Sequence, residues 1–294
     1  TTKLPTTKVH DLEEAKAVYA EQRKRLVTPY LDFYFLHNVN GKRWRTMLDE
    51  GILDWMDSLV EKGEVKHLGF SFHGTYKEFE EIISYRKWDV CQIQLNYMDV
   101  NEQSGIKGYE LSEKLGVPLI IMEPVKGGAL ANPPAPVADI LKGKDPEASF
   151  ASWALRWAAS FPNVMTVLSG MSNMEQVEDN LKTFESFRAL NIEEQETVAS
   201  AREAYKGLIR NGCTTCRYCM PCPGGVNIPL NFKLWNEYAM FGKSGLAWKQ
   251  WKGIPAERRF ESCMECGQCE QQCPQGVSII ADLKAAAAEM DQIR

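Results

Sequence analysis

Eight of the nine cysteines lie in two short runs near the end of this 294-residue chain. The second run has the spacing C-x₂-C-x₂-C-x₃-C followed by proline, which is the ferredoxin pattern for a [4Fe–4S] cluster. The first run repeats this plan with one residue fewer before its last cysteine. Three thiolates from one tight loop can bind three corners of a cube, so the spacing predicts two [4Fe–4S] clusters. The runs consist of Cys213, Cys216, Cys219 and Cys222, and of Cys263, Cys266, Cys269 and Cys273.

Paired runs of this kind exchange their last cysteine. We therefore expect one cluster to take Cys222 from the first run and the other to take Cys273 from the second. The shortened spacing makes Cys222 the least regular ligand, and without it one cluster would remain. Disulfides are typical of small secreted proteins, and zinc sites favour more widely separated cysteine pairs, so both fit less well. Cys91 stands apart in an apolar run and is read as a small buried hydrophobe.

The first 170 residues alternate short apolar runs with segments of helical spacing. This alternation predicts a parallel sheet with helices outside it, and no G-x-G-x-x-G turn points to a doubly wound dinucleotide fold. We expect strands at residues 1–5, 31–37, 65–72, 89–96, 117–123 and 163–170. We expect helices at residues 11–26, 52–63, 75–86, 108–116, 147–160 and 174–184, and beyond them at 192–209, 227–242 and 279–290.

The repeat fits an α/β (β/α)₈ TIM barrel better than an open sheet, although only six βα units are visible. A barrel needs eight strands and about 250 residues. We expect residues 1–210 to form the barrel and residues 211–294 to form a small, mostly helical, ferredoxin-like domain. The 210 residues assigned to the barrel are too few for eight βα units, and the sequence starts at Thr1 rather than Met. We therefore expect the chain to begin inside its own fold, without its first two βα units.

Charge and hydropathy exclude several classes of protein. The chain has 34 Lys+Arg against 39 Asp+Glu, and this acidic balance argues against nucleic-acid binding. No apolar run reaches the ~18 residues of a membrane helix, and the first residues lack the apolar core of a signal peptide. Because cluster thiolates must stay reduced, we expect a cytoplasmic protein.

Six motifs, in order, carry a family resemblance: TKLP, DFYFLH, GFSFHG, QIQLNY, MEPVKGGAL and SGMSNMEQVEDNL. Together they resemble the aldo/keto reductase superfamily, and the cysteine region resembles its iron–sulfur branch. The resemblance covers nearly the whole chain. It implies a barrel that binds a nicotinamide cofactor across its carboxyl-end mouth, where Asp, Tyr, Lys and His reduce a carbonyl.

The resemblance assigns catalytic roles to two residues in this chain. Lys3 matches the lysine that lowers the pKa of the acid tyrosine, and His37 matches the histidine that orients the carbonyl. Ser71 and Gln92 match the positions that hold the nicotinamide carboxamide, while Phe72 stands where Asn is common. The Asp and Tyr of the tetrad are not in this sequence, so we expect little carbonyl reduction by this chain alone.

The resemblance also predicts where the nucleotide binds. The pyrophosphate would run along Glu123, Pro124, Val125, Lys126, Gly127 and Gly128. The adenosine end would meet Ser169, Gly170, Ser172, Asn173, Gln176, Asp179 and Asn180. Members that prefer NADPH place Lys or Arg at the positions of Gly170 and Gln176, and a 2′-phosphate needs such a positive partner. We therefore expect weak NADP preference, with NAD as the alternative.

These features favour an NAD(P)H-dependent oxidoreductase that acts on a small carbonyl or alcohol and passes electrons through its clusters to a redox protein. The alternative is an electron-transfer or cofactor-binding protein whose barrel no longer reduces carbonyls and whose clusters serve as structural staples. Nicotinamide moves two electrons as hydride and a cluster moves one, so coupling them calls for a carrier such as a flavin. The sequence shows no flavin motif, and flavin stays an open alternative.

Overall fold

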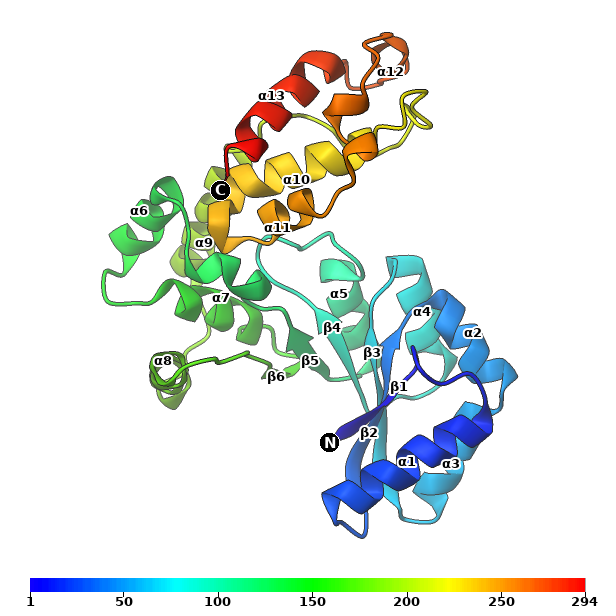
Figure 1. Ribbon diagram of the computed structural model, residues 1–294. Helices are drawn as coiled ribbons and strands as arrows, with labels where there is room; N and C mark the ends of the chain where they lie inside the picture. The colour runs from blue at the N-terminus through cyan, green and yellow to red at the C-terminus, as the bar shows by residue number, and fades with distance from the viewer. Residues whose placement is uncertain (294) are drawn as a thin grey trace. The chain divides into compact units, whose positions relative to one another are not determined.

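The computed structural model of the protein describes residues 1–293 and contains one parallel sheet of six strands (Figure 1). The strands lie in the order of the chain, so each βα unit adds its strand beside the previous one. All six predicted strands are present. They are β1 (Thr2–Pro5), β2 (Leu31–Val39), β3 (Val65–Phe72), β4 (Val90–Gln94), β5 (Leu119–Met122) and β6 (Val164–Val167).

Helices connect the strands, as the alternation predicted, and several of them begin at a side-chain cap. Asp11, Thr75 and Asn173 each accept a hydrogen bond from a backbone N–H of the first turn, which satisfies a donor that the helix cannot. The predicted helices are α1 (Leu12–Leu26), α3 (Ile52–Glu61), α4 (Tyr76–Tyr85), α5 (Gly105–Leu115), α7 (Phe150–Ala159) and α8 (Met174–Glu185).

Four α-helices within residues 1–293 were missed from the sequence: α2 (Gly41–Asp49), α6 (Ala135–Lys144), α11 (Ala247–Lys252) and the short α12 (Gln268–Gln271). Helix α2 begins at a glycine and buries only Trp44 and Met47 among its large side chains, which is a weak helical signal. Helix α6 begins among prolines, which suit the first turn of a helix but resemble a loop in the sequence. Helices α11 and α12 lie in segments for which no helix was predicted.

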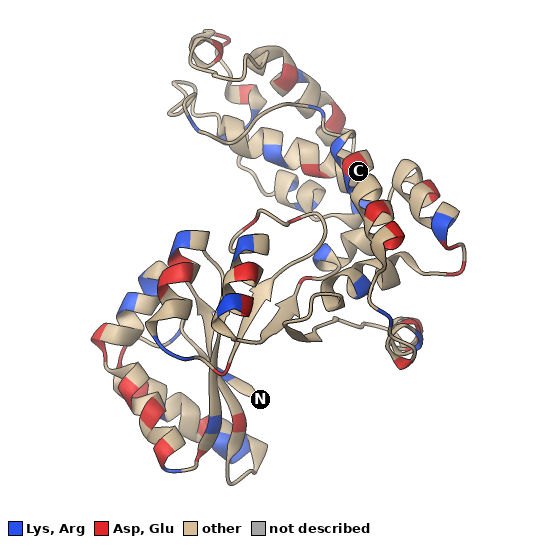
Figure 2. Ribbon diagram, turned by 180° about the vertical axis from the view of Figure 1, so that it is seen from behind, with Lys and Arg blue, Asp and Glu red and all other residues tan. Residues whose placement is uncertain are grey.

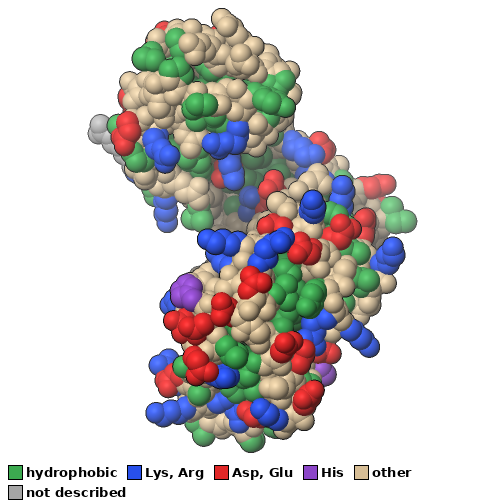
Figure 3. Space-filling view, turned by 90° about the vertical axis from the view of Figure 1, so that its right-hand side faces the viewer, with side chains coloured by type: hydrophobic (Ala, Val, Ile, Leu, Met, Phe, Trp, Pro, Cys, Tyr) green, Lys and Arg blue, Asp and Glu red, His purple; other side chains and the backbone are tan. Residues whose placement is uncertain are grey.

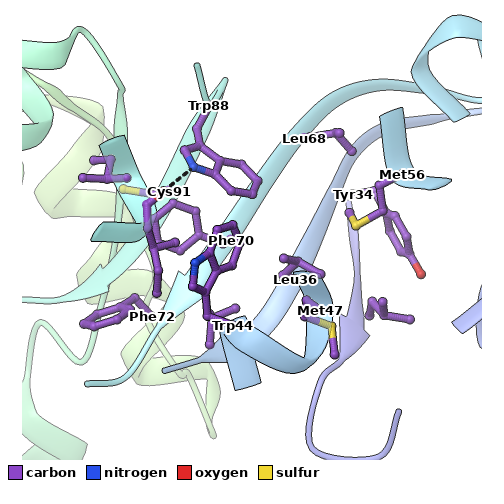
Figure 4. Packing of buried hydrophobic residues seen from close by; sticks show 14 of the residues in the cluster. Tyr34, Leu36, Trp44, Met47, Met56, Leu68, Phe70, Phe72, Trp88 and Cys91 are labelled. Carbon is purple, nitrogen blue, oxygen red and sulfur yellow. Dashed lines mark hydrogen bonds between the residues drawn. The ribbon is translucent and has the colours of Figure 1, made fainter. Parts of the chain in front are cut away.

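The two faces of the sheet carry different residues because side chains alternate along a strand. One face packs against the helices and forms the main core, in which Phe70 lies 4.9 Å from Trp88 between ring centroids (Figure 4). Trp88 Nε1 donates to the Ile82 carbonyl at 2.9 Å, so its only polar atom is satisfied. The strand residues of this face are Leu4, Tyr34, Leu36, Phe70, Phe72, Cys91, Ile93, Leu119 and Ile121.

Contacts divide the chain into two compact units: residues 1–124 with 154–190, and residues 125–153 with 191–294. In the second unit α6 packs on α9 (Ile192–Lys206). A second apolar core lies among α10 (Ile228–Phe241), α11 and α13 (Ile279–Asp291). Of these, α10 and α13 fit the predicted C-terminal helices. The short helices η1 (Lys126–Ala131), η2 (Gly242–Ser244), η3 (Ala256–Arg258), η4 (Phe260–Ser262) and α12 (Gln268–Gln271) complete this unit. The functional boundary at residue 210 stays a prediction.

The charged residues are mixed in sign along the helices (Figure 2). On the face drawn in Figure 3, acidic, basic and apolar side chains are interspersed. Among residues 1–293, no helix combines the length and the apolar character needed to cross a membrane.

The close packing around Gly69 on β3 can be tested by its effect on the stability of the protein. A Cβ atom there would lie 2.6 Å from both Phe35 Cε1 and the Val90 carbonyl oxygen. We expect Gly69→Ala to lower the free energy of unfolding by about 1–3 kcal/mol, measured by urea denaturation, because neither neighbour can move easily. Gly143→Ala is the control, because a Cβ there meets nothing within 4 Å and the helix gains up to about 1 kcal/mol. Equal effects of both substitutions would contradict this packing.

Candidate functional site

The predicted catalytic and carboxamide-binding residues share the face of the sheet that is turned away from the main core. Lys3, His37 and Ser71 alternate with Leu4, Leu36 and Phe70, which pack against the helices. Strand pairing places Pro5 beside His37 and Ser71 beside Gln92. Because parallel strands end on the same side of the sheet, these four side chains lie toward its carboxyl edge. Active sites of barrel enzymes lie at this edge.

The positive charge of Lys3 acts on His37. Partial burial lowers the pKa of Lys3, whose Nζ lies 5.8 Å from the centre of the Phe35 ring. Burial also lowers the pKa of His37, and the positive charges of Lys3 and His73 lower it further. At neutral pH the His37 imidazole is therefore mainly neutral, and a neutral imidazole can donate one hydrogen bond and accept another.

Ser71 and Gln92 are buried and already engaged. The Ser71 hydroxyl accepts a hydrogen bond from the Asn38 backbone N–H at 2.8 Å, and its side chain is fully buried. Gln92 Nε2 donates to the Met122 sulfur at 3.2 Å, which is a weak acceptor. Gln92 Nε2 can therefore leave the sulfur for a stronger acceptor such as a carbonyl oxygen. The Ser71 hydroxyl, in contrast, also holds the backbone at Asn38 in place. Their carboxamide-binding role stays a prediction.

The edge contains functional candidates that the sequence analysis did not select. His73 follows Ser71 by two residues and so lies on the same face, and its backbone N–H donates to the Val39 carbonyl at 2.8 Å. Arg43 on α2 reaches the edge from a neighbouring helix, where its Nη1 donates to the Asn38 carbonyl oxygen at 2.7 Å and to its Oδ1 at 2.8 Å. The alternation could have identified His73, but no pattern pointed to Arg43.

Three residues in or after the carboxyl-end segments of the strands adopt left-handed backbone conformations. They are Asn38 (φ 63°), Gln103 (φ 54°) and Glu123 (φ 57°). Such conformations cost free energy in residues other than glycine and gather at functional sites. Side-chain hydrogen bonds hold Gln103, since its Nε2 donates to Gln94 Oε1 at 2.8 Å and Gln94 Nε2 donates to Asp99 Oδ2 at 3.1 Å.

The predicted pyrophosphate loop crosses from one compact unit to the other. Glu123 and Pro124 end the first part of one unit, and Val125 begins the other. Lys126, Gly127 and Gly128 have φ values of 51°, 61° and 92°, so the two glycines occupy a conformation that suits them. Lys126 Nζ lies 5.5 Å from the centre of the Phe241 ring on α10, within the same unit. Phosphate binding by this loop stays a prediction.

The predicted adenosine-binding residues surround the start of α8. Asn173 caps this helix by accepting from the Gln176 N–H at 2.9 Å, and Gln176 Oε1 accepts from the Ser172 N–H at 2.6 Å. Asn180 Nδ2 donates to Ser169 Oγ at 2.8 Å. The Asp179 carbonyl accepts from Thr183 within α8, and a Cβ at Gly170 would meet nothing within 4 Å. These residues form a polar helix start without Lys or Arg, as the sequence indicated.

The eight clustered cysteines line two adjoining cavities in the C-terminal unit. The cavities share Cys219 and Ile228 in their walls, so they are neighbours. All nine cysteines of the described chain are free thiols, and burial raises the pKa of Cys269 to about 11. The first cavity is lined by Cys213, Cys216, Cys219 and Cys273, and the second, of about 80 Å³, by Cys222, Cys263, Cys266 and Cys269 in addition to the shared Cys219.

This division follows the crossed assignment that the spacing predicted, because Cys222 and Cys273 each sit with the other run. Among residues 1–293, no group of three or more His, Cys, Asp or Glu side chains is placed to hold a single metal ion. Cys91 is fully buried in the main core, where burial raises the pKa of its thiol.

Family profiles match both parts of the chain. The aldo/keto reductase family matches residues 1–203, and the 4Fe-4S dicluster domain matches residues 212–278. The chain belongs to the aldo/keto reductase family. It combines this domain with a 4Fe-4S dicluster domain, which confirms the predicted combination.

Solved aldo-keto reductases share the fold. A thermostable aldo-keto reductase with the inhibitor epalrestat is 25% identical with a TM-score of 0.55, over 68% of this chain and 69% of that one. The holo form of a Bacillus halodurans aldo-keto reductase is 21% identical with a TM-score of 0.52, over 63% and 66%. A Klebsiella pneumoniae aldo-keto reductase in complex with NADPH is 19% identical with a TM-score of 0.52, over 67% and 66%. These likenesses confirm the predicted barrel type of fold.

One curated relative is an uncharacterised oxidoreductase of Schizosaccharomyces pombe. It is 26% identical over 159 residues, which are 54% of this chain and 49% of the relative. The chain therefore matches about half the length of that protein.

The coupling between Lys3 and His37 can be measured directly. We expect Lys3→Gln to raise the pKa of His37, because it removes a positive charge that opposes protonation of the imidazole. The chain has four histidines, so NMR titration of the imidazole signals can follow each one. Lys8→Gln removes an exposed charge and serves as the control. An unchanged or lowered His37 pKa in the Lys3 variant would contradict the coupling.

Proposed function

We propose that this chain is part of an NAD(P)H-linked iron–sulfur oxidoreductase of the aldo/keto reductase type that carries two [4Fe–4S] clusters. The observation that carries the proposal is the division of eight cysteines between two adjoining cavities, in which only Cys219 lines both and Cys222 and Cys273 each lie with the other run. This sorting follows the exchange of the last cysteine between runs, a pattern that two-cluster ferredoxins use.

The cysteines fit such clusters in several respects. Cys213, Cys216, Cys219 and Cys273 would hold one cluster, and Cys222, Cys263, Cys266 and Cys269 would hold the other. Apolar side chains form part of each cavity wall. Phe232 and Ile279 line the cavity of the Cys213 set, and Leu283 lines the cavity of the Cys263 set. Apolar surroundings exclude water from the thiolates, and adjoining cavities would keep the clusters close enough to exchange electrons. Cys216 and Cys266 are exposed, which gives each set an edge toward solvent.

The carboxyl edge of the sheet would hold the nicotinamide cofactor and a small carbonyl or alcohol. Ser71 and Gln92 would bind the carboxamide, and residues 123–128 and 169–180 would bind the rest of the nucleotide. When bound, the nicotinamide supplies or accepts the hydride. His37, kept neutral by burial, would donate a hydrogen bond to the carbonyl oxygen, and Lys3 would add a positive charge near that oxygen.

A second function has its own support: the clusters would act as structural staples. Six of the eight clustered cysteines pack against the second apolar core, so the clusters would tie two irregular loops to α10 and α13. A cluster also moves one electron while nicotinamide moves two, so a flavin or similar carrier would be needed to link them. A visible spectrum with and without dithionite separates the two, because structural clusters would not be reduced and a flavin would show its own bands.

Iron content tests the ligand assignment. After anaerobic reconstitution we expect about eight iron atoms per chain, four for each [4Fe–4S] cluster. Cys222→Ser and Cys273→Ser should each lower this to about four, because each removes one ligand of a different cluster. The buried Cys91→Ala is the control and should keep about eight. Loss of all iron from Cys222→Ser, or no loss, would contradict the assignment.

Nucleotide affinity tests the barrel site. We expect NADH and NADPH to bind with similar affinity, because no cation stands at Gly170 or Gln176 to meet a 2′-phosphate. Gln176→Arg should raise NADPH affinity about tenfold through a charge-assisted hydrogen bond, with little change for NADH. Fluorescence titration measures both, and Gln250→Arg on α11 is the charge-matched control. A strong NADPH preference in the unaltered chain would contradict this reading of the site.

A further inference from the structure

The two cysteine runs have the same backbone conformation around their second cysteine. Thr215 and Glu265 precede that cysteine and have φ values of 58° and 51°. Arg217 and Gly267 follow it and have φ values of 69° and 75°. The two loops are therefore structural counterparts, and Arg217 occupies in the first loop the position that Gly267 occupies in the second.

Arg217 is an uncommon residue for this position. A left-handed backbone costs glycine little, whereas other residues adopt it at a cost in free energy, and such residues gather at functional sites. The Arg217 side chain is exposed and makes no hydrogen bond or ion pair within residues 1–293, so no contact of the described chain accounts for it. It is the only charged residue among those that line the two cysteine cavities. The cavity that it lines belongs to the Cys213 set, which consists of Cys213, Cys216, Cys219 and Cys273.

The Cys213 set and the Cys263 set match in exposure to solvent. Each contains one exposed cysteine, Cys216 or Cys266, and three half-buried ones. The reduction potential of an iron–sulfur cluster depends on solvent exposure, on hydrogen bonds to sulfur and on nearby charge. Because exposure is the same, it cannot separate the potentials of the two clusters, whereas the charges beside the two cavities differ.

The charges that flank the Cys263 set in the sequence are negative. Glu270 follows the third cysteine of the second run, and Met220 holds this place in the first run. The Glu270 carboxylate accepts from a backbone N–H at 2.9 Å and has no cationic partner within residues 1–293. Glu265 also lies in this loop, but Lys284 pairs with it at 2.8 Å and offsets its charge. One set therefore has an unpaired cation beside it, and the other has an unpaired carboxylate.

We propose that Arg217 raises the reduction potential of the cluster of the Cys213 set above that of the other cluster, so that the first electron to enter the protein resides there. A [4Fe–4S] cluster bound by four thiolates is an anion, and its reduction adds one electron and therefore one more negative charge. A fixed positive charge stabilises the reduced form, and a carboxylate destabilises it. The inference rests on the proposed function for the presence of two clusters, but it requires neither nicotinamide nor a partner protein.

Film voltammetry of the reconstituted chain tests the proposal, because an electrode supplies the electron and reaches potentials below that of dithionite. We expect the unaltered chain to give two one-electron waves. Cys273→Ser removes a ligand of the cluster of the Cys213 set and should abolish the wave at the higher potential, whereas Cys222→Ser should abolish the lower one. The reverse assignment, or equal potentials for the two clusters, would overturn the proposal.

Variants of the two matching positions measure the effect of the charge. Arg217→Gly should shift the equilibrium of the higher wave about fivefold toward the oxidised cluster, which is about 40 mV for one electron, and should leave the lower wave unchanged. Arg217→Lys keeps the charge and should keep the potential. Gly267→Arg, where a Cβ would meet nothing within 4 Å, should raise the lower potential by a similar amount. Lys249→Gln is the control, because it removes an exposed charge of α11 that lines neither cavity.

Iron content separates failure of this inference from failure of the proposed function. About eight iron atoms per chain, together with the expected shifts in Arg217→Gly and Gly267→Arg, would support the inference. About eight iron atoms with potentials that neither variant moves would overturn it and leave the two-cluster function intact. About four iron atoms in the unaltered chain would overturn the two-cluster function and this inference with it.

Discussion

The alternation of side chains along parallel strands is the constraint on which the candidate site depends. Leu36 and Phe70 must face the helices to form the main core, and this leaves His37 and Ser71 on the opposite face. Parallel pairing then brings the carboxyl ends of all the strands to one edge. A shift of one residue in β2 would turn His37 toward the helices and remove Leu36 from the core. Core packing and the position of the catalytic candidates are therefore fixed by the same register.

In the C-terminal unit the cysteine loops contain little secondary structure, so other contacts must hold them in place. The cysteine loops pack against the apolar core formed by α10, α11 and α13. Within this core Trp235 donates to Glu289 and Trp251 donates to Asp291, which links its helices. Asn211 Oδ1 accepts from the Cys213 N–H at 2.8 Å, and Asn211 Nδ2 donates to Asp282, so the first cysteine run begins at a fixed residue. Two rigid loops can thus present eight thiols to two cavities.

Periodicity and spacing predicted most of the fold and the cysteine sets, because both are properties of local sequence. The six strands follow from apolar runs such as residues 31–37, and the pairing of Cys222 with the second run follows from the ferredoxin pattern. The part that escaped prediction depends on folded geometry. Arg43 reaches the edge only because Asn38 turns into a left-handed conformation and offers two acceptors. Helix α2, which carries Arg43, was itself missed because two large apolar side chains give little periodicity.

The electrostatics of the edge favour neutral imidazoles beside permanent cations. Burial lowers the pKa of His37 and His73, so in the folded chain both stay neutral at pH values where they would begin to titrate when unfolded. The stability they contribute is present above the unfolded pKa near 6.5 and is lost as the pH falls through their lower folded values. Lys3 and Arg43 add to this loss of stability at low pH, because the charge of Lys3 opposes protonation of His37 and that of Arg43 opposes protonation of His73.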